Sequence, residues 1–321
     1  MENVKNYHIE NFKSIKDLNL NCKRVNIFIG KSNTGKSNII ESLALFTKQN
    51  IGDALRYSSF DNLFLDNQIN ESIYLTLNNL ILGILYSDGG YFYIVSSKDK
   101  TFNSTPQPLG SNPRNFHEKI LFPIKFYKFA NLIEYKELLK GPLSEPDGNN
   151  LYVLLETNNE IYEYADDLLK SYGYDLVLRQ ATKEIEFAKR SGRKLITFPY
   201  FLIADTLRRM IFFNTAIMTN SKSTLIFEEP ESYAFPYYTK ELAGTIADDE
   251  NKNQYFITTH NPYFLKTIVD KTKSDELCVF YTYYKDYQTY VKELPKDKLI
   301  QFFLKPDIDI FLNIDKFEET L

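Results

Sequence analysis

One short segment constrains the fold of this chain more than any other feature. It is spelled G-x-x-x-x-G-K-S and consists of Gly30, Lys31, Ser32, Asn33, Thr34, Gly35, Lys36 and Ser37. The run 25–29 before it is apolar and predicts a buried strand, and residues 39–46 after it place their apolar side chains on one face of a predicted helix. A strand, a glycine-rich loop and a helix in this order indicate a phosphate-binding loop.

The chemistry of such a loop explains its residues. Glycines let backbone N–H groups approach phosphate oxygens, and the helix that follows presents its positive end. We predict that Lys36 reaches the β- and γ-phosphates of ATP and that Ser37 ligates Mg²⁺. Asn38, the next residue, belongs to the same predicted nucleotide-binding set. The alternative is a chance glycine-rich turn at the start of a helix.

Composition and charge limit the classes of protein to consider. The chain has 321 residues, 43% apolar and 25% charged, which is ordinary for a soluble globular protein with a full core. The net charge of −4 means that contact with nucleic acid requires a local basic patch. We see no signal peptide and no apolar run long enough to span a bilayer, and therefore expect a cytoplasmic protein without a membrane partner.

A pair of acids follows a second apolar run. The segment TLIFEEPES, residues 224–232, predicts a buried strand that ends at Glu228 and Glu229. We predict that Glu228 supports Mg²⁺ and that Glu229 orients the attacking water as the catalytic base. The alternative is an exposed acidic turn after a core strand.

A histidine ends the next predicted strand. The chain has three histidines, and His260 follows the apolar run of FITTHNP, residues 256–262. We predict that His260 senses the γ-phosphate, because it comes one strand after the acidic pair. The alternative is that His260 has only a structural role, as a single histidine after a strand usually does.

These three blocks, in this order, resemble the ABC-type ATPase heads of the SMC/RecF/OLD class, as does the N-terminal IENFKSIKDLNL. The resemblance implies an α/β P-loop NTPase of the ABC-ATPase head type. Its mixed central sheet would carry an N-terminal antiparallel β layer and a helical insertion. ATP and Mg²⁺ are the implied cofactors. It also implies that Lys13 touches the nucleotide; a solvated lysine is the alternative.

Two blocks depart from the pattern of that class. The signature that contacts a nucleotide on the opposing subunit would align with residues 203–208, where Asp205 replaces the family's glycine. A carboxylate there would repel phosphate, unless Asp205 points elsewhere, the dimer is loose, or a partner supplies the contact. Arg208 or Arg209 could act as a charge-stabilising finger or lie on a helix surface. The family's histidine-containing loop after the acidic box has become Tyr-Ala-Phe-Pro, residues 233–236.

We expect a single domain over residues 1–321. Residues 1–100 form an N-terminal lobe with the phosphate loop, 101–198 a helical or lid insertion, and 199–321 a C-terminal lobe with the acidic box and histidine. The pattern from 160 to 194 is charged and helical. Basic residues within it offer a contact with DNA or RNA, with a solvated helix end as the alternative; they are Lys189, Arg190, Arg193 and Lys194.

The predicted function is an ATP-hydrolysing switch that works as a homo-oligomer, a dimer or higher. No nuclease domain and no coiled-coil arm follow from the sequence, so we expect an effector on another chain. The resemblance implies a setting in antiviral defence or nucleic-acid maintenance. The alternative is a nucleotide-gated scaffold with little need for hydrolysis. A transporter's nucleotide-binding subunit is disfavoured because an LSGGQ-like signature is absent from the sequence.

Overall fold

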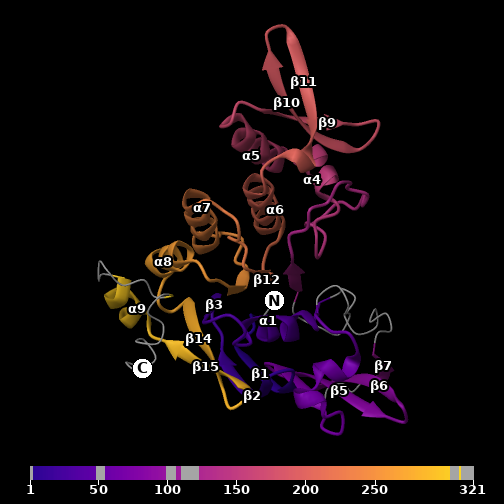
Figure 1. Cartoon of the computed structure of the whole chain (residues 1–321), viewed down its shortest axis with the longest axis vertical. Helices are drawn as coiled ribbons and strands as arrows, with labels where there is room; N and C mark the ends of the chain where they lie inside the picture. Colours follow the sequence, from indigo (N-terminus) through magenta and orange to yellow (C-terminus); the bar gives the residue numbers. More distant parts are fainter. Residues whose placement is uncertain (1–2, 48–54, 99–105, 110–122, 304–310, 312–321) are drawn as a thin grey trace.

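The computed structural model describes residues 3–47, 55–98, 106–109, 123–303 and 311 (Figure 1). Most of residues 101–122 of the predicted insertion lie outside the described residues. Within the described part, the chain forms two six-stranded sheets, one three-stranded sheet and helices that cover them.

The central sheet is mixed. All its neighbouring strands are parallel except β14 and β15, which form an antiparallel hairpin at one edge. In spatial order the strands are β15 (Gln288–Leu294), β14 (Leu277–Lys285), β3 (Val25–Ile29), β13 (Gln254–Thr258), β12 (Thr224–Glu228) and β8 (Ile124–Tyr127). The predicted strands that precede the phosphate loop, the acidic pair and His260 are therefore adjacent, and their carboxyl ends meet at one edge of the sheet.

The second six-stranded sheet is antiparallel throughout and confirms the predicted N-terminal β layer. Its strands in spatial order are β2 (Ile15–Asn21), β1 (Asn6–Phe12), β4 (Ile73–Leu77), β5 (Leu80–Ser87), β6 (Gly90–Ser97) and β7 (Gln107–Pro108). The turn between β5 and β6 uses positive φ angles at Asp88 and Gly89, 49° and 79°. Such a pair of residues is typical of a two-residue hairpin.

The central sheet separates two hydrophobic cores. Side chains alternate between its faces, so Ile27 enters one core and Phe28 the other. The Phe28 core lies against α1 (Lys36–Ala44) and the antiparallel sheet. Because both faces are covered, all five residues of β3 are buried, which explains why all of them except Asn26 are apolar.

The opposite face of the central sheet is covered by helices. They are α6 (Asp205–Thr219), α7 (Pro236–Ala247), α8 (Pro262–Lys271) and α9 (Lys296–Phe303). Short 3-10 turns connect other segments: η1 (Phe60–Leu63), η2 (Leu65–Asn67) and η3 (Tyr200–Leu202). In the described part of the chain, no helix combines the length and the apolar character that crossing a membrane requires.

A lobe projects from α6 at one end of the molecule (Figure 1). It consists of α4 (Leu151–Thr157), α5 (Asn159–Lys170) and the antiparallel sheet β9 (Asp175–Arg179), β10 (Glu184–Ser191) and β11 (Lys194–Pro199). The helical pattern expected for 160–194 is therefore wrong beyond Lys170. Gly173 takes a φ of 78° just after α5, and Ile185 and Phe187 then alternate as buried strand residues.

Candidate functional site

The glycine-rich loop connects β3 to α1, and its glycines are required by close contacts. Gly30 and Gly35 have φ angles of 149° and 94°. A Cβ atom would lie 2.1 Å from the Thr282 carbonyl oxygen at Gly30 and 2.1 Å from Thr289 Oγ1 at Gly35. No side chain fits at either position, so the two glycines of the motif are fixed by the β14–β15 hairpin packed beside them.

Lys36 begins α1 and is folded back over the loop. Its Nζ donates to the carbonyl oxygens of Gly30 and Lys31, at 2.9 Å and 2.6 Å. Burial lowers the pKa of the Lys36 ammonium to about 8, against the opposite effect of Glu229. The ammonium is therefore charged at neutral pH, and it is held where an anion above the loop can reach it.

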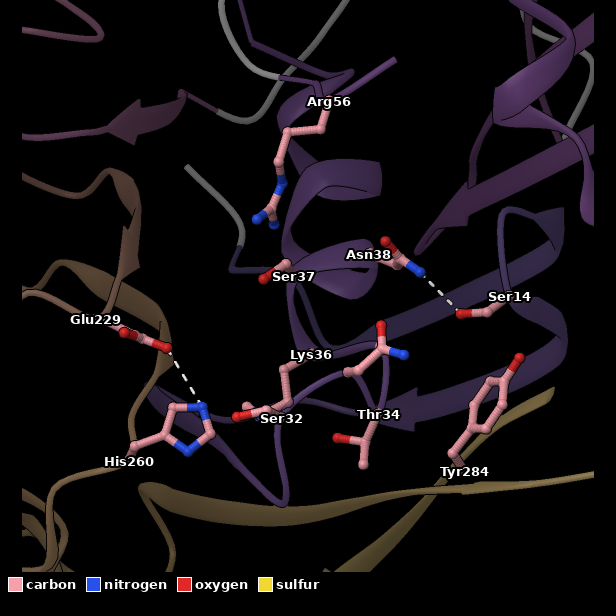
Figure 2. A pocket seen from close by; sticks show the side chains of 12 residues that line it. Ser14, Ser32, Thr34, Lys36, Ser37, Asn38, Arg56, Glu229, His260 and Tyr284 are labelled. Atoms are coloured by element: carbon pink, nitrogen blue, oxygen red, sulfur yellow. Dashed lines mark hydrogen bonds and ion pairs between the residues drawn. The ribbon is translucent and has the colours of Figure 1, made fainter. Parts of the chain in front are cut away.

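A polar cavity of about 330 Å³ opens above the loop (Figure 2). Its lining comes from distant parts of the sequence. The lining residues are Ser14, Ser32, Asn33, Thr34, Gly35, Lys36, Ser37, Asn38, Arg56, Glu229, His260 and Tyr284. The predicted loop residues 32–38, Glu229 and His260 are thus brought together in one cavity. Gly30 and Lys31 are not in its lining; Lys31 lines a neighbouring groove with Tyr281 and Lys292.

The first acid of the pair contacts the loop directly. Glu228 ends β12, and its Oε1 accepts a hydrogen bond of 2.6 Å from Ser37 Oγ. A hydroxyl and a carboxylate are hard oxygen donors, which is the ligand chemistry that Mg²⁺ prefers. The two residues predicted to hold the metal therefore lie together and fit it.

The second acid contacts the predicted sensor. Glu229 has a φ of 42°, and its backbone N–H donates to the carbonyl oxygen of Thr258 at 3.1 Å. Its Oε1 lies 3.3 Å from His260 Nε2 (Figure 2). Burial and the Lys36 charge lower the pKa of His260, while Glu229 raises it. Since the net shift is downward, the imidazole is mainly neutral at pH 7.

A third acid, Glu231, was missed by sequence reasoning. Its side chain is buried, one carboxyl oxygen accepts from Thr259 Oγ1, and the other has no protein partner. Thr259 Oγ1 also accepts from the backbone N–H of Asn261, which caps α8. Glu231 thus supports the turn that carries His260. The sequence offers only its place two residues after the acidic pair, which says nothing about burial.

The buried Glu231 predicts a dependence of stability on pH. Burial raises its pKa from 4.5 to about 7, against the hydrogen bond from Thr259. The native state therefore holds this proton more tightly, and stability is lost as pH rises from about 4.5 to about 7. We expect Glu231→Gln to gain up to about 3 kcal/mol relative to wild type between pH 5 and pH 8, measured by urea unfolding. Parallel curves for the variant and the wild type would refute this, and Glu163→Gln, at an exposed glutamate of α5, is the control substitution.

Lys13, which the resemblance predicts to touch the nucleotide, forms an ion pair in this structure. Its Nζ pairs with the buried Glu41 and donates to the Arg56 carbonyl oxygen at 2.8 Å, so it lies outside the cavity lining. The neighbouring Ser14 lines the cavity instead, and its Oγ accepts from Asn38 Nδ2 at 2.7 Å (Figure 2). Lys13 has a φ of 51°, which belongs to the tight turn between β1 and β2.

The altered signature lies at the start of α6, outside the cavity lining. Asp205 forms an ion pair with Arg208, whose Nε also donates to the Ile203 carbonyl oxygen at 3.2 Å. Arg209 lies 4.6 Å above the Phe129 ring and 5.4 Å from that of Tyr233. Both arginines are engaged within their own chain, and the Asp205 charge is compensated by Arg208.

The predicted basic cluster lies on the hairpin of β10 and β11, in the lobe away from the cavity (Figure 1). Lys189, Arg190, Arg193 and Lys194 are all exposed there. The turn of the hairpin contains Gly192, with a φ of 61°. These residues belong to a β-hairpin, with Arg193 in its turn, rather than to a helix end.

Comparison with known proteins shows which solved structures share this fold. Two solved structures of similar fold are an Smc head bound to the C-winged helix domain of ScpA and a Pyrococcus furiosus Smc head bound to the C-terminal domain of ScpA. The first has a TM-score of 0.59 and 14% identity, covering 92% of this chain and 99% of that one. The second has a TM-score of 0.54 and 12% identity, covering 93% and 98%.

The fold is thus that of an SMC-type ATPase head. A curated relative, the uncharacterized protein MJECL10 of Methanocaldococcus jannaschii, is 43% identical over 53 residues, 16% of this chain. The chain spans 24% of the length of that relative. The AAA ATPase domain family matches residues 3–194, more than half of the sequence. This chain therefore belongs to the AAA ATPase domain family.

Proposed function

We propose that the chain binds ATP with Mg²⁺ in the cavity above the loop and hydrolyses it slowly, and that the nucleotide state switches an oligomer. One observation carries the proposal. Ser37, Glu229 and His260 line the cavity above the phosphate loop, where Glu229 contacts His260, and Ser37 donates to Glu228, which lies just outside the lining. An exposed acidic turn or a chance glycine turn would not bring these four side chains together.

The residues have distinct roles in this proposal. The backbone N–H groups of residues 32–37 and the Lys36 ammonium bind the phosphates, with Lys36 leaving the carbonyl oxygens that it contacts now. Ser37 and Glu228 hold Mg²⁺, which neutralises charge on the phosphates. Glu229 polarises the attacking water. The neutral His260 Nε2–H donates to the γ-phosphate.

A second copy of the chain is the partner that we propose for the face beside the acidic box. The loop between β12 and α7, here called the aromatic loop, and the first turn of α7 carry three exposed aromatic side chains. They are Tyr233, Phe235 and Tyr237, which are 84%, 69% and 65% exposed. Thr206 Oγ1 donates to the Tyr233 carbonyl oxygen at 3.0 Å, so the aromatic loop lies against the altered signature. Exposed aromatic clusters are typical of association surfaces.

This surface gives a testable prediction. We expect Tyr233→Ser combined with Phe235→Ser to weaken ATP-dependent self-association by at least tenfold, because each aromatic anchor contributes about 2 kcal/mol. Analytical ultracentrifugation of the Glu229→Gln background in ATP measures it. Tyr287→Ser, at an equally exposed tyrosine in the β14–β15 turn, is the matched control. Equal association of both variants would exclude this face.

The setting rests on resemblance. The Smc heads of similar fold were crystallised with ScpA domains. By analogy, we propose a protein effector on another chain, in antiviral defence or nucleic-acid maintenance. Exposed Lys189, Arg190, Arg193 and Lys194 offer a phosphate-backbone contact at the projecting hairpin.

A nucleotide-gated scaffold is the second candidate. It is favoured by Asp205, whose carboxylate replaces a glycine of the family signature and is tied to Arg208 within the same chain. Such a head binds ATP to assemble a partner without depending on turnover. Comparing Glu229→Gln with Lys36→Ala separates the two functions.

A further inference from the structure

A side-chain cation already lies beside the proposed metal ligands. Arg56 Nη2 donates to Glu228 Oε1 at 3.0 Å, and Ser37 Oγ donates to that same oxygen at 2.6 Å. Arg56 also lines the cavity, with its guanidinium directed toward Ser37 (Figure 2). No sequence motif pointed to this arginine.

The backbone carbonyl and the Nε atom of Arg56 are held by contacts outside the cavity lining. Its Nε donates to Glu41 Oε1 at 2.6 Å, and its backbone carbonyl accepts from Lys13 at 2.8 Å. Glu41 is 3% exposed, whereas the Arg56 side chain is 59% exposed. The contact with the buried Glu41 is therefore the firm one, and the contact with Glu228 is the one that solvent and ligands can reach.

Two cations that share Glu228 at close range repel each other. Within about 5 Å, the repulsion between a divalent cation and a guanidinium exceeds thermal energy even at an effective dielectric constant near 20. A metal at Ser37 and Glu228 therefore favours a displaced Arg56. Conversely, without metal the guanidinium supplies the positive charge that shields a phosphate from the Glu228 carboxylate.

We propose that Arg56 is a placeholder for the divalent cation. In the nucleotide-free protein its guanidinium neutralises Glu228, and entry of metal with nucleotide releases it while Glu41 retains the Nε contact. This inference rests on the proposed function. It adds that the metal and Arg56 compete for Glu228. Arg56 therefore contacts Glu228 when nucleotide is bound without metal, and leaves Glu228 when nucleotide is bound with metal.

The test uses the full chain, Arg56→Met, and Mn²⁺ as the metal probe in the presence of ADP. We expect Mn²⁺ to bind about tenfold more tightly than to wild type, by electron paramagnetic resonance. We also expect ADP in the presence of a chelator to bind about fivefold more weakly, by calorimetry. These opposite changes distinguish competition from simple loss of structure.

A matched control is Arg179→Met, which removes a similarly exposed arginine from an ion pair with Glu186 in the lobe. Arg56→Met could destabilise the fold because it removes an ion-pair partner from the buried Glu41. In that case the same measurements are made on the double variant Glu41→Gln with Arg56→Met, in which the buried charge is removed as well. Unchanged or weaker Mn²⁺ binding in the variants overturns the placeholder. Failure of wild type to bind ADP at all, with or without Mn²⁺, overturns the proposed function as well.

Discussion

Lys36→Ala is expected to lower the affinity for ATP about a thousandfold. Removing one partner of a buried, charge-assisted contact costs about 4 kcal/mol, and no other ammonium lines the described cavity. The loss follows from position as well as charge, because Lys36 is the first residue of α1 and is only 5% exposed. Calorimetric titration with Mg²⁺ and a non-hydrolysable ATP analogue measures the effect.

The control for this substitution is Lys266→Ala, on the exposed face of α8. Melting temperatures without ligand should be compared first, since Lys36 also bonds two carbonyl oxygens of the loop. If the folded Lys36→Ala protein keeps ATP affinity within threefold of wild type, the loop does not hold the triphosphate.

Glu229→Gln is expected to slow hydrolysis about a thousandfold while ATP affinity changes little. A general base contributes about 10²–10⁴ to the rate, and an amide cannot accept the proton from water. Glu229 also raises the pKa of His260, so the substitution leaves the imidazole more firmly neutral. Phosphate release and ATP titration on the same preparation separate the two effects.

Ser232→Ala is a useful comparison, because Ser232 Oγ only donates to Glu229 Oε2, at 3.1 Å. It should alter the rate by less than tenfold. Full biological activity of Glu229→Gln together with loss in Lys36→Ala would make the nucleotide-gated scaffold the correct function. A full hydrolysis rate in Glu229→Gln would remove Glu229 as the base.

The core of the site could be predicted from sequence because each element follows a buried strand. The loop, the acidic pair and His260 come after β3, β12 and β13, which are parallel neighbours. In a parallel sheet, residues at strand ends share an edge. The short apolar runs and the residues that follow them therefore predict that these side chains share one edge of the sheet, even when the structure of the long connections between the strands is unknown.

Other parts of the site depend on contacts that no local pattern encodes. Arg56 is 172 residues from Glu228 along the chain, and nothing around it indicates that the two meet. Glu231 is read as another exposed acid until its burial is known. In the lobe, the charged residues of β10 suggested a helix, although Ile185 and Phe187 alternate toward the core.

The way in which the lobe stands on α6 has a mechanical consequence. This helix has 15 residues, about 22 Å at 1.5 Å per residue. Its first turn lies against the aromatic loop, and the projecting hairpin stands beyond it (Figure 1). A tilt at this base would displace the basic tip of the hairpin farther than the base itself, because displacement grows with distance from the pivot.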